Sequence, residues 1–247
     1  MKHLRQYIRQ ILLQEGLHLD TSEDLALLVH TKGNETTYIL FRFDKTMNFI
    51  NKKLAGDNYV STDEMAYGLV RSGTKDQVIG VLRCIRPYMS SHWGAAEVIL
   101  SAAESGWGPT LYDTVMGEEP RGIMADRRQV SRAAYRIYDY YLQHRDDIEK
   151  KPLDSSKHQW TEDTFDDGQP GSDGRYNKYA NPESQEQFLE DATCWVFDRD
   201  PVPQAAIWKK KGDPIIELLL TNFRPPDIEQ FIRVLVRRTY EYYSNDD

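Results

Sequence analysis

The amino-acid sequence predicts an α+β fold. One observation is a pair of short apolar segments on either side of a Gly-Asn turn at residue 33, which is the pattern of a β-hairpin. Another is a set of later runs rich in Val, Ile and Leu, which favour buried strands. A third is a group of longer segments in which apolar residues recur every three or four positions, the period of an amphipathic helix. Together these patterns predict a sheet with flanking helices.

Most of the strands are expected before residue 126. The hairpin has Lys32-Gly33-Asn34-Glu35 as its turn, and Pro87 ends the strand that follows it. The alanines of residues 95–103 would also suit a helix. Residues 44–74 contain no strong periodic element. Strands are predicted over residues 25–31, 36–43, 77–85, 95–103 and 121–125.

The helices are predicted from spacing and from their first residues. Ala134, Ile137, Tyr138 and Tyr141 recur on one face of a single segment. Pro109 suits the first turn of a helix that begins near it. Helices are predicted over residues 2–15, 111–116, 131–144 and 227–243, and two more strands over residues 193–197 and 215–221.

The predicted elements divide the chain into four parts. Residues 1–20 carry the N-terminal amphipathic helix, and residues 21–149 form the core. Residues 150–185 are rich in Asp, Ser, Gly, Pro and Lys and poor in aliphatic residues, as expected of a polar loop or insertion. Residues 186–247 carry strands and a helix that complete the core or are appended to it.

Composition excludes several classes of function. The chain of 247 residues is 40% hydrophobic, and no run approaches the ~20 apolar residues that span a bilayer. A net charge of −8 argues against sequence-independent binding of nucleic acid. The first residues lack the apolar block of a secretory signal, and Cys84 and Cys194 lack metal-ligand spacing. We therefore expect a cytoplasmic protein without a membrane partner.

A glycine-containing turn between a predicted strand and a predicted helix is the main candidate for a binding site. It reads Gly106-x-Gly108-x-x-Leu111. A helix N-terminus offers unpaired N–H groups and a positive dipole end, and glycines allow a phosphate to approach closely. Ser105, Gly106 and Gly108, with the N–H groups of Trp107 and Thr110, are the candidate phosphate-binding residues, although an ordinary strand-to-helix turn has the same composition.

The next helix adds a second motif. Ser131-x-x-Ala134-x-x-x-Tyr138 follows a short predicted strand. With the glycine turn before it, this order resembles the GNAT superfamily of N-acetyltransferases, whose corresponding helix reads Asn-x-x-Ala-x-x-x-Tyr. The string from Gly106 to Asp113, Gly-Trp-Gly-Pro-Thr-Leu-Tyr-Asp, is most similar to phage-encoded GNAT-like proteins.

The resemblance implies a mixed, mostly antiparallel sheet and acetyl-CoA as co-substrate. It places the cofactor at the glycine turn and at Ser131. It makes Tyr138 the acid that protonates the leaving thiolate, and Glu97 the base. Glu104 and His92 are alternative bases, and Tyr138 also suits a packed helix face. Arg127 and Arg128 could reach a phosphate.

The sequence also departs from the family. Ala103 stands where Arg or Gln is usual, and Ser131 replaces Asn. Pro109 removes an N–H from the turn. The end of the tyrosine helix lacks the usual Gly-Phe. Weak cofactor binding or a relic site is consistent with these changes.

Two main classes of function therefore remain open, and the negative net charge disfavours a third, a nucleic-acid-modifying enzyme on the same fold. The first is an acyl-CoA-dependent N-acyltransferase acting on an unidentified amine. The second is a catalytically inactive GNAT-like scaffold or phage virion or assembly protein, with a protein partner held by the N-terminal helix or the C-terminal region. Leu13-Gln14-Glu15-Gly16 resembles a phage head-protein processing site, but the motif is very short, and a packing helix is the favoured interpretation. The string 166–174 is interpreted as an acidic turn-rich loop and not as a calcium site, because it lacks the alternation and closing Glu of an EF-hand.

Overall fold

The computed structural model describes residues 24–56, 60–70, 77–86, 95–126, 130–152 and 192–243. Within these ranges the chain forms one mixed sheet of seven strands and six α-helices. The predicted α+β class is confirmed. The N-terminal helix predicted over residues 2–15 and most of the loop predicted over residues 150–185 lie outside the described residues.

The strands follow the order β1-β2-β3-β4-β5-β7-β6 across the sheet. Every neighbouring pair is antiparallel except β4 and β5, which run parallel. The sheet is therefore mixed and mostly antiparallel. The strands are β1 (Leu25–Lys32), β2 (Glu35–Arg42), β3 (Val78–Ile85), β4 (Ala96–Ala103), β5 (Ile123–Ala125), β6 (Glu149–Pro152) and β7 (Trp195–Asp198).

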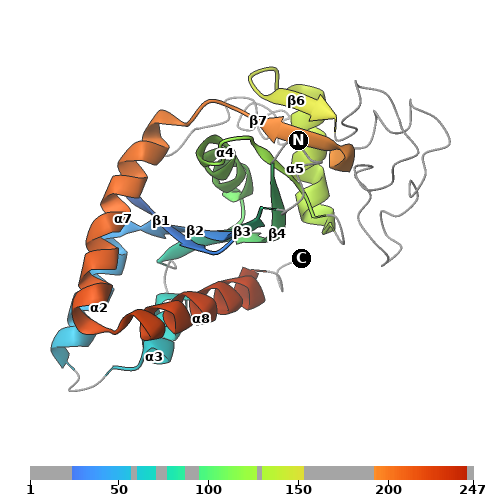
Figure 1. Ribbon diagram of the computed structural model, residues 1–247. Coiled ribbons are helices and arrows are strands. Elements are labelled where there is room, and N and C mark those ends of the chain that lie inside the picture. Colours follow the sequence, from blue (N-terminus) through green and yellow to red (C-terminus); the bar gives the residue numbers. More distant parts are fainter. Residues whose placement is uncertain are drawn as a thin grey trace, which may run out of the picture.

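The helices cover both faces of the sheet. In Figure 1, α4 and α5 lie above the sheet, α3 and α8 lie below it, and α7 runs beside β1. The helices are α2 (Phe43–Gly56), α3 (Thr62–Val70), α4 (Gly108–Glu118), α5 (Arg132–His144), α7 (Pro203–Asn222) and α8 (Pro225–Tyr243), and a short 3-10 turn, η3 (Ala192–Cys194), precedes β7. None of the described helices is both long and apolar enough to cross a bilayer.

The two faces of the sheet bury separate apolar cores. The upper core lies under α4 and α5 and includes Leu111, Tyr112 and Tyr138. The lower core lies between the sheet, α3 and α8, and includes Leu69, Phe231 and Leu235. Strand residues alternate between the two cores because successive side chains of a strand point to opposite faces.

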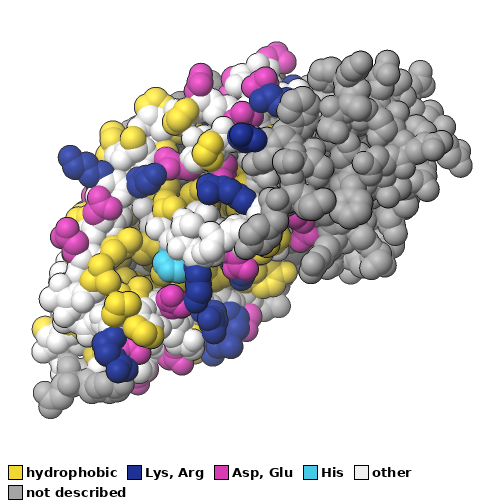
Figure 2. Space-filling model, viewed as in Figure 1, with side chains coloured by type: hydrophobic (Ala, Val, Ile, Leu, Met, Phe, Trp, Pro, Cys, Tyr) yellow, Lys and Arg dark blue, Asp and Glu magenta, His cyan; other side chains and the backbone are white. Residues whose placement is uncertain are grey.

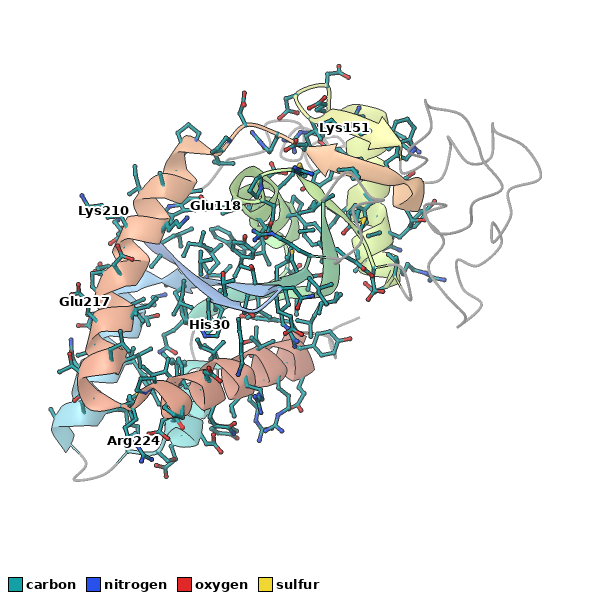
Figure 3. The ribbon with its side chains drawn as sticks, viewed as in Figure 1. His30, Glu118, Lys151, Lys210, Glu217 and Arg224 are labelled. Atoms are coloured by element: carbon teal, nitrogen blue, oxygen red, sulfur yellow. The ribbon has the colours of Figure 1, made fainter. Side chains whose placement is uncertain are left out.

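Helix α7 covers the outer edge of β1. Its first half contributes Trp208 to the upper core and its second half contributes Leu219 to the lower core. At its middle, Gly212 approaches β1 so closely that an added Cβ would lie 2.3 Å from the Leu27 carbonyl oxygen. Lys210 and Glu217 project from the opposite side of α7 (Figure 3). A helix in this place protects a sheet edge from pairing with another chain.

The strand predicted over residues 215–221 is wrong, because these residues form the second half of α7. Ile215 and Leu219 are buried and lie four residues apart, which is the helical spacing. A short apolar run is compatible with either a buried strand or a buried helix. The length of the surrounding segment, 20 residues, decides for the helix.

The other differences from the sequence prediction are smaller. Residues 44–74, which show no strong periodicity, contain α2 and α3. The strand predicted over residues 193–197 begins at Trp195, and β6 was not predicted. The hairpin, the strands at 77–85, 95–103 and 121–125, and the helices at 111–116, 131–144 and 227–243 are confirmed to within a few residues.

Candidate functional site

The parallel strands β4 and β5 separate and leave a slot between them. They pair only from Ala96 opposite Ile123 to Val98 opposite Ala125. Beyond Val98, β4 continues for five residues, whereas the chain after β5 turns toward α5. The slot between these segments has a volume of about 410 Å³. Most of the candidate residues from the sequence gather here. The slot is lined by residues 98–106, Gly108, Pro109, Leu111, Tyr112, Asp126, Val130, Ser131, Ala133, Ala134, Ile137, Tyr138, Tyr240 and Tyr243.

The slot runs along the open edge of β4. The pairing with β3 shifts by one residue, so that Arg83 faces Leu100 and Cys84 faces Val98, which leaves Ile99 as a bulge. The Glu104 N–H donates to the Ile79 carbonyl on the β3 side. The main-chain groups of Ser101 and Ala103 therefore point to the opposite side, into the slot.

The glycine turn lies at one end of the slot. Gly106 has a φ of +90°, in the left-handed region that favours glycine. The Leu111 N–H donates to the Trp107 carbonyl, so α4 begins at the expected place. The N–H groups of Gly108 and Thr110 lie in the first turn, where a helix offers no acceptor four residues earlier. Gly108 lines the slot and Thr110 does not, so the Gly108 N–H is the candidate donor that the turn offers to a bound anion.

Trp107 does not contribute the donor that the sequence predicts. Its N–H donates to the Glu104 carbonyl at 2.9 Å and closes the turn. Its side chain is half-buried and packs against the upper core. Trp107 is absent from the residues that line the slot, so it does not plug the slot.

Ser131 caps α5. Its hydroxyl accepts a hydrogen bond from the Ala134 N–H at 3.2 Å, which satisfies a free donor of the first turn. Ser131 and Ala134 also line the slot. The motif that begins at Ser131 thus has a local structural role, and its residues still border the candidate site.

Tyr138 lies at the bottom of the slot and is almost fully buried. Its hydroxyl donates to the Met124 carbonyl at 3.3 Å, and its ring stacks on Phe197. Burial raises the pKa of Tyr138 well above its usual value. The phenol therefore stays protonated at neutral pH.

Tyr112 and Ser101 form a pair of hydroxyl groups in the slot, which the sequence did not predict. Their oxygens lie 2.8 Å apart, and the Tyr112 ring meets the Tyr138 ring edge to face. Burial raises the pKa of Tyr112 to about 12. Tyr112 belongs to the string that resembles phage proteins, which was the only sequence signal for it. Ser101 had none.

The side chains of Glu97 and Val98 lie on different faces of β4. Strand alternation places Glu97 with Met124, its partner on β5, and it is half-buried. Glu97 does not line the slot. Among the other candidates, His92, Arg127 and Arg128 lie outside the described residues.

The charged side chains that line the slot are acidic. Glu104 and Asp126 line it, and its described lining includes no Lys, Arg or His. The Glu104 carboxylate is paired at 2.7 Å with Arg42, whose side chain is only 5% exposed. Within the described ranges no cluster of His, Cys, Asp and Glu could hold a metal ion, and the string 166–174 lies outside them.

A second hollow lies at the other end of α8, where the first turns of that helix meet α7 and β1. It has a volume of about 220 Å³ and is mostly aliphatic, with His30 and Glu229 as its polar members. Figure 3 labels His30 there, and Figure 2 shows apolar side chains gathered around it. The hollow brings together none of the candidate residues from the sequence.

Comparisons with protein-family models, with curated proteins and with solved structures found no match for the chain.

Proposed function

We propose that the chain is an acyl-CoA-dependent N-acyltransferase with a GNAT-like fold, and that acetyl-CoA binds in the slot. The observation that carries the proposal is the open edge of β4 beside the first turn of α4. Coenzyme A has a pyrophosphate, which suits a helix N-terminus, and an arm with two amides, which suits an unpaired strand edge. The slot offers both along one continuous surface.

The chemistry is direct transfer. The amine nitrogen attacks the thioester carbonyl carbon, the new C–N bond forms, and the C–S bond breaks. The amine loses a proton to a base, and the thiolate leaving group takes one from an acid. In this proposal Tyr138 is the acid and Glu97 is the base.

Tyr138 borders the slot and carries its proton at neutral pH, which suits an acid, although burial raises its pKa and makes it a weaker acid than an exposed tyrosine. Its bond to the Met124 carbonyl is long at 3.3 Å, so a thiolate can compete for the proton. Glu97 approaches from the other face of β4, which requires the amine to enter from that face.

A second candidate function is a scaffold without catalysis, such as a virion or assembly protein. The charge of the lining favours it, because Asp126 is a carboxylate, Glu104 is already paired with Arg42, and the described lining offers no cation to a phosphate. Ala103 lacks the side chain that would hold the pyrophosphate, and Pro109 lacks an N–H.

Calorimetric titration with acetyl-CoA separates the two functions. Gly108 lines the slot, and a Cβ there would already lie 3.3 Å from Ile137 Cδ1, so Gly108→Trp would fill the slot. Gly56→Trp is the matched control, because nothing lies within 4 Å of a Cβ at Gly56. The transferase proposal expects binding to the wild type and to Gly56→Trp but not to Gly108→Trp. Absence of wild-type binding at millimolar ligand would favour the scaffold.

A further inference from the structure

The slot has a second mouth on the lower face of the sheet. Val98, Ser101 and Tyr112 line its upper side, next to α4. Leu100 and Ala102 also line it, and they pack against the lower core between the sheet and α8. The open edge of β4 is therefore accessible from both faces.

Two tyrosines of α8 form the wall of this lower mouth. Tyr243 is fixed, because its hydroxyl donates to the Val78 carbonyl at 2.7 Å. Tyr240 lies one turn earlier, lines the slot, and remains 43% exposed. A large aromatic side chain that is partly exposed at a cavity wall offers apolar ring surface to a ligand.

The charges at the lower mouth exclude one class of ligand. Glu104 lies on the same face of β4 as Leu100 and Ala102, and it is neutralised by the buried Arg42. Because the described lining has no cation, a phosphorylated or carboxylated acceptor would find no partner there. An uncharged ring or a cationic amine meets no such penalty.

We infer that the lower mouth binds the acceptor, and that the acceptor is a primary amine carried on an aromatic ring. The ring packs against Tyr240, and the amine points along β4 toward the bulge at Ile99 and the face that carries Glu97. This inference rests on the proposed transferase function and adds the class of acceptor and its direction of entry.

The test measures binding and not turnover. 2-Phenylethylamine and n-hexylamine, both primary amines, are titrated by calorimetry into the protein with and without coenzyme A, which has no acyl group to transfer. We expect 2-phenylethylamine to bind about tenfold more tightly than n-hexylamine, because only its ring can stack on Tyr240.

The variants locate the site. Tyr240→Ala is expected to weaken 2-phenylethylamine binding about tenfold, and Tyr240→Phe is expected to restore it. Tyr67→Ala is the matched control, because Tyr67 on α3 is 42% exposed and does not line the slot. Equal binding of the two amines, or unchanged binding in Tyr240→Ala, would overturn the inference.

Failure of the inference is distinguishable from failure of the proposed function. If coenzyme A binds and 2-phenylethylamine does not, the acceptor class is wrong while the transferase proposal stands. If the amine binds in a Tyr240-dependent way and coenzyme A does not, the aromatic-amine site is supported and the transferase proposal falls.

Discussion

The hydroxyl of Tyr141 on α5 donates to Asp113 Oδ1 on α4 at 2.6 Å, and the same hydroxyl lies 3.2 Å from the Pro109 carbonyl oxygen. Asp113 is fully buried. Its second oxygen accepts from Arg145 at 3.1 Å and from Arg199 at 2.9 Å. This network joins the glycine turn, α5 and the chain after β7, so it fixes the wall of the slot.

Asp113→Ala is expected to destabilise the protein strongly. The substitution removes the buried carboxylate that faces Arg199 and Arg145, and Arg145, whose side chain is only 6% exposed, keeps only its pair with the half-exposed Asp147. Loss of one partner of a buried ion pair costs about 3–5 kcal/mol. Urea denaturation followed by circular dichroism measures the free energy of unfolding.

An exposed ion pair supplies the control for this prediction. Asp227 pairs with Arg224, whose side chain is 84% exposed. Asp227→Ala is expected to change the free energy of unfolding by less than about 1 kcal/mol. Similar losses in the two variants would contradict a special role for the Asp113 network.

The stability of this region is expected to fall in acid. Arg145 donates to Asp147 at 2.6 Å and lowers the pKa of that carboxyl. A carboxyl whose pKa is lowered by folding stabilises the protein above its unfolded pKa, and this contribution is lost as the pH falls through the folded pKa. The window therefore lies below the usual aspartate pKa of about 3.9.

Asp147→Asn tests this window. The variant is expected to be less stable at neutral pH by less than about 1 kcal/mol, because the carboxyl is half-exposed. Its stability is expected to decline less steeply than that of the wild type below about pH 4. If thermal unfolding shows the same loss of stability with falling pH in Asp147→Asn and in the wild type, Asp147 does not cause the acid sensitivity.

Local signals account for the part of the fold that the sequence predicts. Gly33 has a φ of +62° in the hairpin turn, and Pro109 stands in the first turn of α4. Glycine permits a positive φ and proline fixes φ near the helical value, so each residue predicts its local conformation without tertiary contacts. The strands β2 and β3 are apolar on both faces because both cores cover them.

Tertiary contacts account for what the sequence did not predict. Helix α2 buries only Thr46 and Ile50, so its pattern is weak. A Cβ at Gly68 would lie 2.3 Å from the ring of Phe49, and this contact between α2 and α3 has no local signature. The glycine turn was predictable as a site, whereas the place of Tyr240 was not, because only the path of α8 below the sheet brings it to β4.

Tyr138→Phe and Tyr141→Phe separate a chemical role from a structural one. Tyr138→Phe removes the 3.3 Å hydrogen bond to the Met124 carbonyl and the hydrogen bond to the Tyr112 hydroxyl, so we expect a loss of about 1 kcal/mol in unfolding free energy. Tyr141→Phe removes a donor from a buried carboxylate and is expected to cost about 1–3 kcal/mol.

Under the transferase proposal the kinetic effects run the other way. Tyr138→Phe is expected to lower kcat by about 10²-fold with unchanged acetyl-CoA affinity, because only the acid is lost. Tyr141→Phe leaves the acid in place. Equal kcat values for Tyr138→Phe and the wild type would remove Tyr138 from the reaction.

Gly212→Ala is expected to destabilise the protein even though alanine is the better helix former. In an exposed helix interior the change would add about 1 kcal/mol of stability. At Gly212, however, the new Cβ would lie 2.3 Å from the Leu27 carbonyl oxygen, and α7 would have to move away from β1. Because backbone atoms cannot rotate aside, we expect a loss of about 1–3 kcal/mol.

Gly56→Ala is the matched control on α2, because nothing lies within 4 Å of its added Cβ. It is expected to leave the unfolding free energy within about 0.5 kcal/mol of the wild type. Thermal and urea unfolding of the two variants measure the difference. A stabilising Gly212→Ala would mean that α7 does not approach the edge of β1 closely, and the edge strand would then lack the cover that keeps it from pairing with another chain.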